Sequence, residues 1–333
     1  MSQPLPNVVP IVTIFGGSGF IGRYVAQRMA RAGWRVRVAV RRPNEAGFVR
    51  PYGTVGQVEP IQANIRDEAS TRRAIAGASA VVNCVGILNE FGKQTFDAVL
   101  DQGAGRIARI AAEEGVGRLV HVSAIGADAG SESDYAKGKA AGEAAVLAAF
   151  PGAVILRPSV VFGDGDGFFR KFASMARFAP VLALPLPETK FQPVYVDDVA
   201  AAAVAAVTGT AAGVYELGGP EVKTLRALVV EMLGVIRRRR RVVALPMGIA
   251  GLMASVFDGA QRFGFGLFSN GILTRDQLKL LGTDNVVSAG AKGFAELGVT
   301  PTAMEAVLDS YLYSYRPHGQ FDAIQESAER LWA

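Results

Sequence analysis

The stretch that decides the fold begins at Gly16 and reads GGSGFIG. An apolar run over residues 10–15 precedes it and predicts a buried strand, while an apolar periodic pattern over 21–32 predicts a helix after it. This glycine spacing suits a tight turn in which the backbone approaches a pyrophosphate, since a Cβ atom would interfere there. The first helical amides would then face the phosphates. The alternative is a glycine-rich turn without a ligand. We predict dinucleotide contacts at Gly16, Gly17, Ser18, Gly19, Phe20, Ile21 and Gly22.

Expected strands and helices alternate along the first half of the chain. The strands cover 10–15, 36–40, 55–62, 80–85, 119–123 and 153–157, and the helices cover 21–32, 70–76, 95–114 and 135–150. Such alternation is typical of a parallel sheet with helices on both faces. We predict an α/β fold, a Rossmann doubly wound parallel sheet over residues 1–160 to which segments around 190–220 return. A smaller C-terminal docking or substrate-like region is expected over 161–333.

Composition excludes several classes of function. The chain has 333 residues, of which half are apolar and a fifth are charged, and its net charge is +5. The single cysteine, Cys84, forms no internal disulfide, and His121 and His318 lie far apart, so no metal site is expected. The apolar stretch 242–257 contains Pro246 and is shorter than the roughly 20 residues of a transmembrane helix. We expect neither a secretory signal nor a nucleic-acid partner.

The end of the second expected strand indicates which nicotinamide dinucleotide binds. An NAD site usually carries Asp or Glu there, which binds the hydroxyl groups of the adenosine ribose. Here the strand runs into Arg41 and Arg42, and the first acidic residue is Glu45. A guanidinium group suits a 2′-phosphate because it forms paired, charge-assisted hydrogen bonds. The sequence therefore favours NADP(H) over NAD(H), and the alternative is a pair of solvated arginines on a loop.

A tyrosine and a lysine occur four residues apart where the helix 135–150 begins. Tyr135 and Lys139 then share one helix face. A lysine near a phenol stabilises the phenolate, so we expect Lys139 to lower the pKa of Tyr135. Such a tyrosine can pass a proton to or from a substrate oxygen while a nicotinamide moves hydride. The motif alone is weak, and its position after the fifth expected strand gives it weight.

Several motifs follow one another in order between about residues 10 and 220. They are GGSGFIG, the Asn64-Ile65 pair, CVG from Cys84, YAKGK from Tyr135, LRPSVVFG from Leu156 and FQPVYVDDVA from Phe191. In order and spacing these motifs resemble the short-chain dehydrogenase/reductase superfamily, in its extended or atypical branch. Besides the glycine turn and the two arginines, the resemblance implies cofactor contacts at Asn64, Ile65, Val85, Gly86, Ser123, Tyr135, Lys139 and Pro158.

One catalytic position departs from the superfamily pattern. Members carry Ser or Thr at the end of the fifth strand; Ser123 is present here, but the position two residues further on is Ile125. If that position is the catalytic one, the set Tyr135, Lys139 and Ser123 is vestigial and Ser123 only supports the cofactor. Eleven residues separate Ser123 from Tyr135, which leaves little room for a substrate loop.

Three longer phrases carry a closer resemblance. They are HVSAIGAD from His121, AAFPGAVILRPSVVFG from Ala148 and DQLKLLGTDNVVS from Asp276. These phrases resemble the 39 kDa accessory subunits of respiratory complex I and their alphaproteobacterial relatives. The resemblance implies a tightly held NADPH, a structural or assembly role without independent turnover, and subunits of the peripheral arm as partners. It also implies a peripheral position on the cytoplasmic face of the bacterial inner membrane, or on the matrix side in mitochondria.

A basic run precedes an apolar segment in the second half of the chain. The run is Arg237, Arg238, Arg239, Arg240 and Arg241, and the segment extends from Val242 to Phe268 with few charges. A basic cluster beside an amphipathic apolar segment favours contact with an anionic membrane surface or an acidic partner. The alternatives are a solvated helix end before a strand, and the core of the second region. Tyr311, Tyr313, Tyr315 and Trp332 belong either to the same surface or to packing.

Two functions therefore follow from the sequence. The first is an accessory, non-catalytic subunit of NADH:quinone oxidoreductase that keeps NADP(H) for stability or assembly. The second is an NADP-dependent short-chain reductase or epimerase acting on a sugar nucleotide or a small carbonyl. In it Tyr135 would be the general acid/base, Lys139 its pKa modulator and Ser123 an oxyanion partner. A weaker third idea is a redox-sensing regulator whose partner binding depends on NADP(H).

Overall fold

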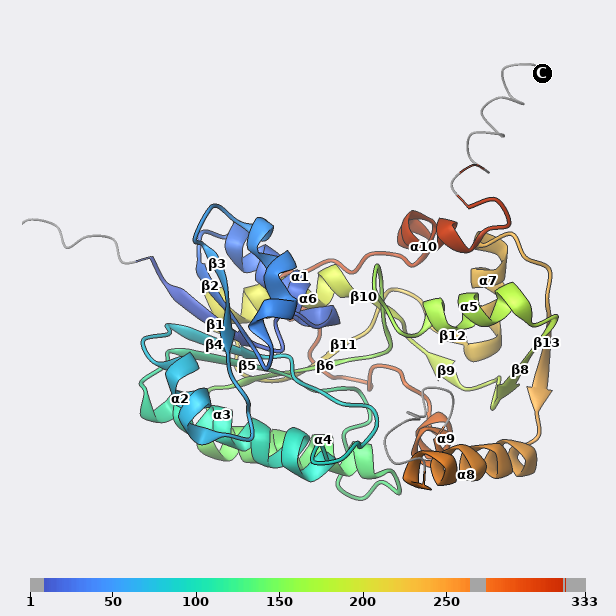
Figure 1. Ribbon diagram of the computed structural model, residues 1–333, viewed down its shortest axis with the longest axis horizontal. Helices are drawn as coiled ribbons and strands as arrows, with labels where there is room; N and C mark the ends of the chain where they lie inside the picture. The colour runs from blue at the N-terminus through green and yellow to red at the C-terminus, as the bar shows by residue number, and fades with distance from the viewer. Residues whose placement is uncertain (1–8, 264–273, 320, 322–333) are drawn as a thin grey trace, which may run out of the picture. The chain divides into compact units, whose positions relative to one another are not determined.

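The computed structural model describes residues 9–263, 274–319 and 321, with 257–263 described by their backbone alone. The chain forms two compact units (Figure 1). Unit 1 takes the described residues up to Arg157, a segment over Asp197–Glu216 and a further segment over Lys292–Val299. Unit 2 takes Pro158–Val196, Leu217–Ala291 and the described residues from Thr300 onward. Three separate stretches of the chain thus assemble unit 1.

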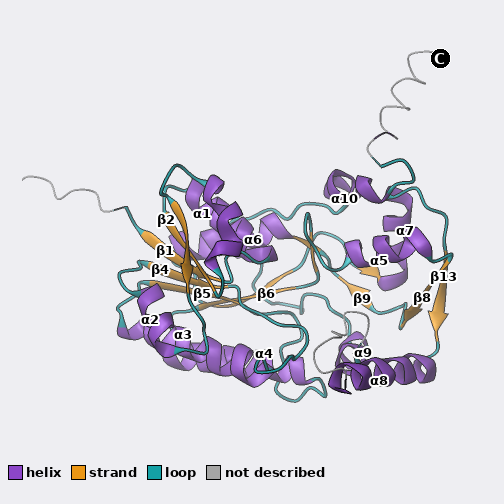
Figure 2. Ribbon diagram, viewed as in Figure 1, coloured by secondary structure: helices purple, strands orange, loops and turns teal. Residues whose placement is uncertain are grey.

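A seven-stranded sheet forms the centre of unit 1 (Figure 2). Its strand order is β11-β6-β5-β4-β1-β2-β3, and the neighbours among β1 to β6 pair in parallel. This order is that of a doubly wound Rossmann sheet, in which ligands bind beyond the carboxyl ends of β1 and β4. The predicted fold class is confirmed. The strands are β1 (Ile11–Phe15), β2 (Arg35–Val40), β3 (Val58–Gln62), β4 (Ala80–Asn83), β5 (Arg118–Val122), β6 (Val154–Pro158) and β11 (Gly213–Leu217).

Helices cover both faces of this sheet, with α1 and α6 over one face and α2, α3 and α4 over the other (Figure 1). The buried side of α3 carries Ala104, Ile107 and Ala111 at the spacing of one helix face, and these residues pack with Phe15 of β1. Because both faces are covered, the strands read as nearly continuous apolar runs. The helices are α1 (Phe20–Arg31), α2 (Glu68–Ile75), α3 (Gln102–Glu113), α4 (Asp134–Ala149) and α6 (Val196–Thr208), with 3-10 helices over Pro43–Tyr52 and Ala295–Leu297.

The helix predicted over 95–114 is interrupted near its start. Asp97–Asp101 forms a π-helical turn, and α3 begins at Gln102, whose amide donates to the carbonyl of Asp97. α4 packs very close to this widened turn, because a Cβ on Gly142 would collide with the carbonyl oxygen of Leu100. A π-helical turn inserts a residue without changing the apolar pattern much, so hydrophobic periodicity does not reveal it.

Two ion-pair sites hold the later segments of unit 1. Arg28 of α1 donates from Nε and Nη2 to the carboxylate of Asp197 at 2.6 and 2.7 Å, which ties α6 to α1. Arg157 of β6 donates from Nε and Nη2 to Glu143 of α4 at 2.9 and 2.6 Å, and its Nη1 lies 3.5 Å from Glu216 of β11. Glu143 is buried, so its charge depends on Arg157 for compensation.

Unit 2 packs short strands and helices around a core of its own, in which Phe162 and Phe169 meet Leu228, Met232 and Leu308. β8 pairs in parallel with β13, β7 in parallel with β10, and β9 antiparallel with β12. Along the parts of the chain that are described, no helix is long and apolar enough to cross a membrane. The elements are β7 (Val161–Phe162), α5 (Phe169–Phe178), β8 (Val181–Pro185), β9 (Lys190–Phe191), β10 (Val194–Tyr195), β12 (Lys223–Thr224), α7 (Leu225–Val235), β13 (Arg241–Leu245), α8 (Met247–Phe263), α9 (Arg275–Leu281), α10 (Glu305–Leu312) and a 3-10 helix over Tyr313–Tyr315.

The aromatic residues near the C-terminus divide between core and surface. Tyr311 is buried, and its hydroxyl donates to Asp166 at 2.5 Å. Tyr315 packs at the edge of the same core, whereas Tyr313 is exposed. Trp332 lies outside the described residues. Tyr311 therefore belongs to packing and not to a docking surface.

Replacing Glu143 by alanine should destabilise the protein. Arg157 would keep only its longer ion pair with Glu216, at 3.5 Å, so we expect the free energy of unfolding to fall by about 3 kcal/mol. Urea denaturation followed by circular dichroism measures this loss. As a control, Glu68→Ala removes a carboxylate from an exposed ion-pair network on α2 and α3, and the urea midpoint should hardly move. If the two variants lose the same free energy of unfolding, burial of the ion pair does not explain the effect of Glu143→Ala.

Candidate dinucleotide site

The glycine turn joins β1 to α1 in unit 1 and leaves no room for side chains. Gly16 has a φ of +72°, which favours glycine, and a Cβ there would lie 3.1 Å from the carbonyl carbon of Cys84. A Cβ on Gly22 would collide with the carbonyl oxygen of Gly16. Gly19 begins α1 without any side-chain cap. The amides of the first turn of α1 are thus left for an anionic ligand.

A cavity of about 720 Å³ in unit 1 is lined by this turn and by residues that follow β2, β3 and β4. Its volume suits a bound small molecule or cofactor. The cavity brings together the predicted residues Gly16, Ser18, Gly19, Arg41, Arg42, Asn64, Ile65, Val85 and Gly86. The lining residues that sequence reasoning missed are Ala39, Val40, Glu45, Ala63, Arg66, Cys84, Ile87, Gln94 and Val99. The other predicted residues, Gly17, Phe20, Ile21, Gly22, Ser123, Tyr135, Lys139 and Pro158, do not line it.

Two arginines of the cavity hold the loop that follows β4. Arg41 donates from Nη1 to Oε1 of Gln94 at 2.7 Å, and Arg66 donates from Nη1 to the carbonyl of Lys93 at 2.6 Å. Both partners are neutral, so each guanidinium keeps its full charge toward the cavity. Arg66 directly follows the Asn64-Ile65 pair, and this adjacency could have marked it in the sequence. The loop itself carries no comparable signal.

The cavity lining has a net positive charge. Arg42 forms an ion pair with Glu45 at 3.0 Å, and both side chains are largely exposed. Three lining arginines, Arg41, Arg42 and Arg66, face one carboxylate, which leaves two positive charges. This balance suits the phosphate groups of a dinucleotide, and Glu45 is the one acidic group that would oppose a 2′-phosphate.

The Asn64-Ile65 pair forms the wall that follows β3. Oδ1 of Asn64 accepts a hydrogen bond from the amide of Arg66 at 3.2 Å, and the amide of Asn64 donates to Oγ of Ser70 at 3.1 Å. These bonds fix the polar side chain beside the apolar one of Ile65. A polar and an apolar group side by side suit the edge and the face of an adenine ring, as the family resemblance implies.

Tyr135 and Lys139 lie on α4, as predicted. Nζ of Lys139 lies 5.9 Å from the centre of the Tyr135 ring and donates to the carbonyl of Val122 at 3.2 Å. A Cβ on Gly86 would lie 3.6 Å from the same Nζ. Because Gly86 lines the cavity, the buried ammonium group borders the cavity wall.

The expected effect of Lys139 on Tyr135 is wrong. Tyr135 packs edge-on against Phe96, with ring centres 5.9 Å apart, and burial raises the pKa of Tyr135 to about 12. Burial also lowers the pKa of Lys139 to about 8, against the nearby charge of Glu143, which raises it. Desolvation thus outweighs the attraction between phenolate and ammonium. Tyr135 stays protonated near neutral pH.

Ser123 and the residues around it lie at the end of β5. Oγ of Ser123 is buried and has no hydrogen-bond partner among the described residues, and Ile125, two residues further on, is buried. His121, which sequence reasoning left unassigned, contacts Nδ2 of Asn83 through Nδ1 at 3.0 Å, and burial lowers the pKa of His121 to about 3. Oδ1 of Asn83 accepts from the amide of Val85 at 3.0 Å. The neutral histidine therefore helps to fix the cavity wall.

Comparisons with known proteins match these features. The sequence profile described as the NAD dependent epimerase/dehydratase family matches residues 12–218. A protein of Arabidopsis thaliana named NADH dehydrogenase (ubiquinone) 1 alpha subcomplex subunit 9, mitochondrial, is 37% identical over 318 residues, which cover 93% of this chain and 79% of the relative. A ceramide reductase of Caulobacter vibrioides is 33% identical over 207 residues, which cover 62% of this chain and 64% of the relative.

Solved structures support the fold. The Bordetella bronchiseptica enzyme WbmG in complex with NAD aligns with a TM-score of 0.69, covering 96% of both chains. The sequence identity in this alignment is 15%, so the likeness concerns the fold and not the activity.

The buried ammonium of Lys139 should make stability depend on pH. Folding lowers its pKa from 10.5 to about 8, so the folded state holds this proton less tightly than the unfolded state. The resulting penalty is fully present below pH 8 and disappears as the pH rises from 8 to 10.5. It amounts to about 3 kcal/mol.

Lys139→Met removes this titrating group. The nucleotide-free variant should be more stable than the wild type at pH 7, and the difference should shrink toward pH 10.5. Urea denaturation of both proteins across this range measures the difference. A difference that does not change with pH would contradict the assignment.

Proposed function

This chain belongs to the NAD dependent epimerase/dehydratase family, and from that premise we propose that it is an accessory subunit of respiratory complex I. In this role it holds NADP(H) and turns over no substrate of its own. The observation that carries the proposal is the 37% identity, over 93% of the chain, to a protein named as a subunit of NADH dehydrogenase. An alignment of this length includes both units and not the dinucleotide cavity alone.

The nucleotide has a structural role in this proposal. The glycine turn and the three cavity arginines support NADP(H), with NADPH the expected form, and Arg41 is the expected reader of the 2′-phosphate. A ligand that binds only the folded state stabilises it, by about 4 kcal/mol when present at 1,000 times its dissociation constant. A gain of this size is sufficient reason to keep the site without chemistry.

Two features of the catalytic positions support the absence of turnover. Burial raises the pKa of Tyr135 to about 12, which disfavours this residue as a base near neutral pH. Ile125 offers no hydroxyl group to a substrate carbonyl. Ser123 then serves the cofactor or the packing of β5, and Lys139 serves the cofactor.

The second candidate function is an NADP-dependent reductase or epimerase that acts on a sugar nucleotide or a small carbonyl. The observation that favours it is the retained pair of Tyr135 and Lys139 beside the cavity wall, together with the 33% identity to a ceramide reductase. In a carbonyl reduction the neutral phenol of Tyr135 would donate its proton to the substrate oxygen, whereas base catalysis would require substrate binding to lower its pKa.

As a subunit, the protein would contact the peripheral arm of complex I on the cytoplasmic face of the bacterial inner membrane. A second surface, in unit 2, we assign to contact with the anionic membrane itself. It comprises the five arginines from Arg237 to Arg241 and the apolar segment from Val242 to Phe268, of which residues 264–268 lie outside the described range.

Purification of the protein from its native membranes tests the subunit role. After mild detergent extraction, the protein should co-purify with subunits of the peripheral arm, and denaturation should release about one NADP(H) per chain. Identification of the released nucleotide by mass spectrometry completes the test. Recovery in the soluble fraction, without these subunits and with NADPH oxidation on a carbonyl substrate, would favour the reductase instead.

Arg41→Glu should shift the nucleotide preference toward NAD(H). The variant replaces a phosphate-binding cation by a carboxylate, so we expect NADP(H) affinity to fall by a factor of roughly 10 to 100, with little change for NAD(H). Isothermal titration calorimetry on the nucleotide-free protein measures both affinities. Arg50→Glu is the control, because Arg50 is exposed and does not line the cavity. An unchanged preference would exclude Arg41 as the 2′-phosphate reader.

A further inference from the structure

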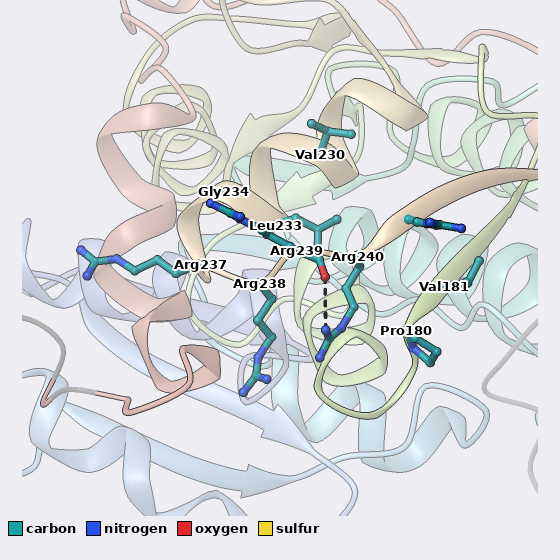
Figure 3. Close-up of a pocket in the computed structure, with 10 residues that line it drawn as sticks. Pro180, Val181, Val230, Leu233, Gly234, Arg237, Arg238, Arg239 and Arg240 are labelled. Carbon is teal, nitrogen blue, oxygen red and sulfur yellow. Dashed lines mark hydrogen bonds between the residues drawn. The ribbon is translucent and has the colours of Figure 1, made fainter.

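The five arginines lie in unit 2, in the connection between α7 and β13, and line a cavity of about 990 Å³ (Figure 3). The remaining lining residues are apolar: Pro180, Val181, Val230, Leu233 and Gly234. No carboxylate is among the residues that line this cavity in the described chain. Five positive charges and no negative one therefore border it, which favours an anionic ligand.

The backbone displays these arginines in different directions. Arg237 has a φ of +54°, and its amide and that of Arg238 donate to the carbonyls of Gly234 and Leu233 at 3.0 and 3.1 Å. This is a helix end in the left-handed conformation, a position usually occupied by glycine. The side chains of Arg237 and Arg238 consequently diverge (Figure 3). Arg237 occupies this position despite the conformational cost to a residue with a side chain. The divergent side chains suit an extended anionic surface better than one small ion.

Neutral partners anchor two of the arginines. Nε of Arg238 donates to the carbonyl of Tyr315, and Nε of Arg240 donates to the carbonyl of Ala176, each at 2.8 Å. Within the described chain neither arginine forms an ion pair with a carboxylate. Arg240 also donates from Nη1 to the carbonyl of Arg239 at 3.2 Å, again a neutral partner (Figure 3). A guanidinium held in this way can bind a phosphate oxygen through its other nitrogens.

Exposed apolar side chains occur in the elements that contribute to this cavity, and one of them, Val181, lines it. Val181 of β8 and Val243 of β13 lie on the outward side of this two-stranded sheet and are 42% and 41% exposed. Phe178, at the end of α5, is 85% exposed. A solvated helix end accounts for the arginines but not for these apolar groups.

A second group of exposed apolar side chains lies on α8, which follows β13 in the chain. Ile249, Leu252, Met253 and Val256 are exposed, and their spacing of three, four and seven residues places them on one helix face. The opposite side carries the buried Ala250 and Ala254. The sequence has no charged residue from Val242 to Phe257. The predicted alternative that this segment forms the core of the second region is therefore wrong for the outer face of α8. An exposed apolar stripe of this kind marks a contact surface.

We propose that this arginine–apolar surface docks on an anionic phospholipid bilayer. The arginines bind headgroup phosphates, and the stripe of α8 enters the boundary between headgroups and acyl chains. The stripe favours lipid over free phosphate or an acidic protein face, because only lipid offers phosphate beside hydrocarbon. The proposal deepens the membrane contact named above. It rests on unit 2 alone and needs neither the nucleotide nor complex I.

Vesicle co-sedimentation of the isolated full-length protein tests the proposal. The protein should bind vesicles that contain phosphatidylcholine with phosphatidylglycerol and should stay in solution with phosphatidylcholine alone. Binding should weaken as the salt concentration rises. The nucleotide content of the same preparation is measured separately, so a failure here leaves the subunit proposal to its own test. A folded wild type that does not bind anionic vesicles overturns the proposal.

Two double variants separate charge from apolar contact. Arg239→Ser with Arg241→Ser should weaken vesicle binding about thirty-fold, since each cation near the surface contributes a factor of roughly five. The control Arg31→Ser with Arg50→Ser changes the net charge equally at exposed positions of unit 1 and should have little effect. If both pairs weaken vesicle binding equally, net charge alone explains the binding, and the proposed lipid site at the five arginines is wrong.

The second pair is Leu252→Ser with Val256→Ser, compared with Val55→Ser and Leu88→Ser at exposed positions of unit 1. The α8 pair should weaken binding at least ten-fold and the control pair should not. If the α8 pair has no effect, or if inorganic phosphate at constant ionic strength releases the protein completely, the arginines serve a soluble anion or an acidic protein and the lipid proposal fails.

Discussion

Backbone amides at the start of α1 can meet a pyrophosphate only because nothing projects from the bend before them. The bend is crowded from two sides: Gly16 approaches the backbone that follows β4, and Gly22 approaches the carbonyl oxygen of Gly16. The sheet order places β4 directly beside β1, which creates this crowding and opens the crevice at the same time. The contact from Asn83 to His121 then holds the end of β4 against β5, so the wall opposite the bend is also fixed.

Burial decides the chemistry of the residues behind that wall. Lysine beside tyrosine suggests an activated phenolate, and the sequence alone supports that reading. In the folded chain the same packing that brings the two side chains together also removes water from both. Loss of solvation raises the pKa of one group and lowers that of the other, so each is driven toward its neutral form. The motif is therefore present, but the lowered pKa that it suggests is not, and Tyr135 is favoured in its protonated form.

A feature could be predicted when residues close in the sequence determine it, and could not when contacts between distant parts of the chain determine it. The strands β1 to β6 and the helices between them were predictable because apolar periodicity and glycine stops are local signals. Arg41 and Arg42 were identified as cavity residues because they directly follow a strand. Gln94 reaches the cavity from a loop whose sequence shows no recognisable pattern. The segment Lys292–Val299 joins unit 1 through long-range hydrogen bonds that the sequence does not indicate. One of them runs from the amide of Glu216 to the carbonyl of Lys292 at 2.8 Å. The π-helical turn escaped prediction because it depends on the close packing of Gly142.

The two units handle charge and apolar surface in opposite ways. In unit 1 the buried charges of Glu143 and Arg157 compensate each other, and the strands are covered on both faces. In unit 2 the described residues that line the cavity of the arginine run include no carboxylate, and the outer face of α8 leaves apolar side chains in water. Both features cost free energy in the isolated chain, and the outer face of α8 is not required by the core, since α8 packs through Ala250 and Ala254 and accepts a hydrogen bond at Ser255 from Arg275. Whatever removes water from that face recovers the cost, so the stability of unit 2 and its docking are thermodynamically linked. This linkage explains how the protein can fold although its exposed arginines and apolar side chains are unfavourable in water.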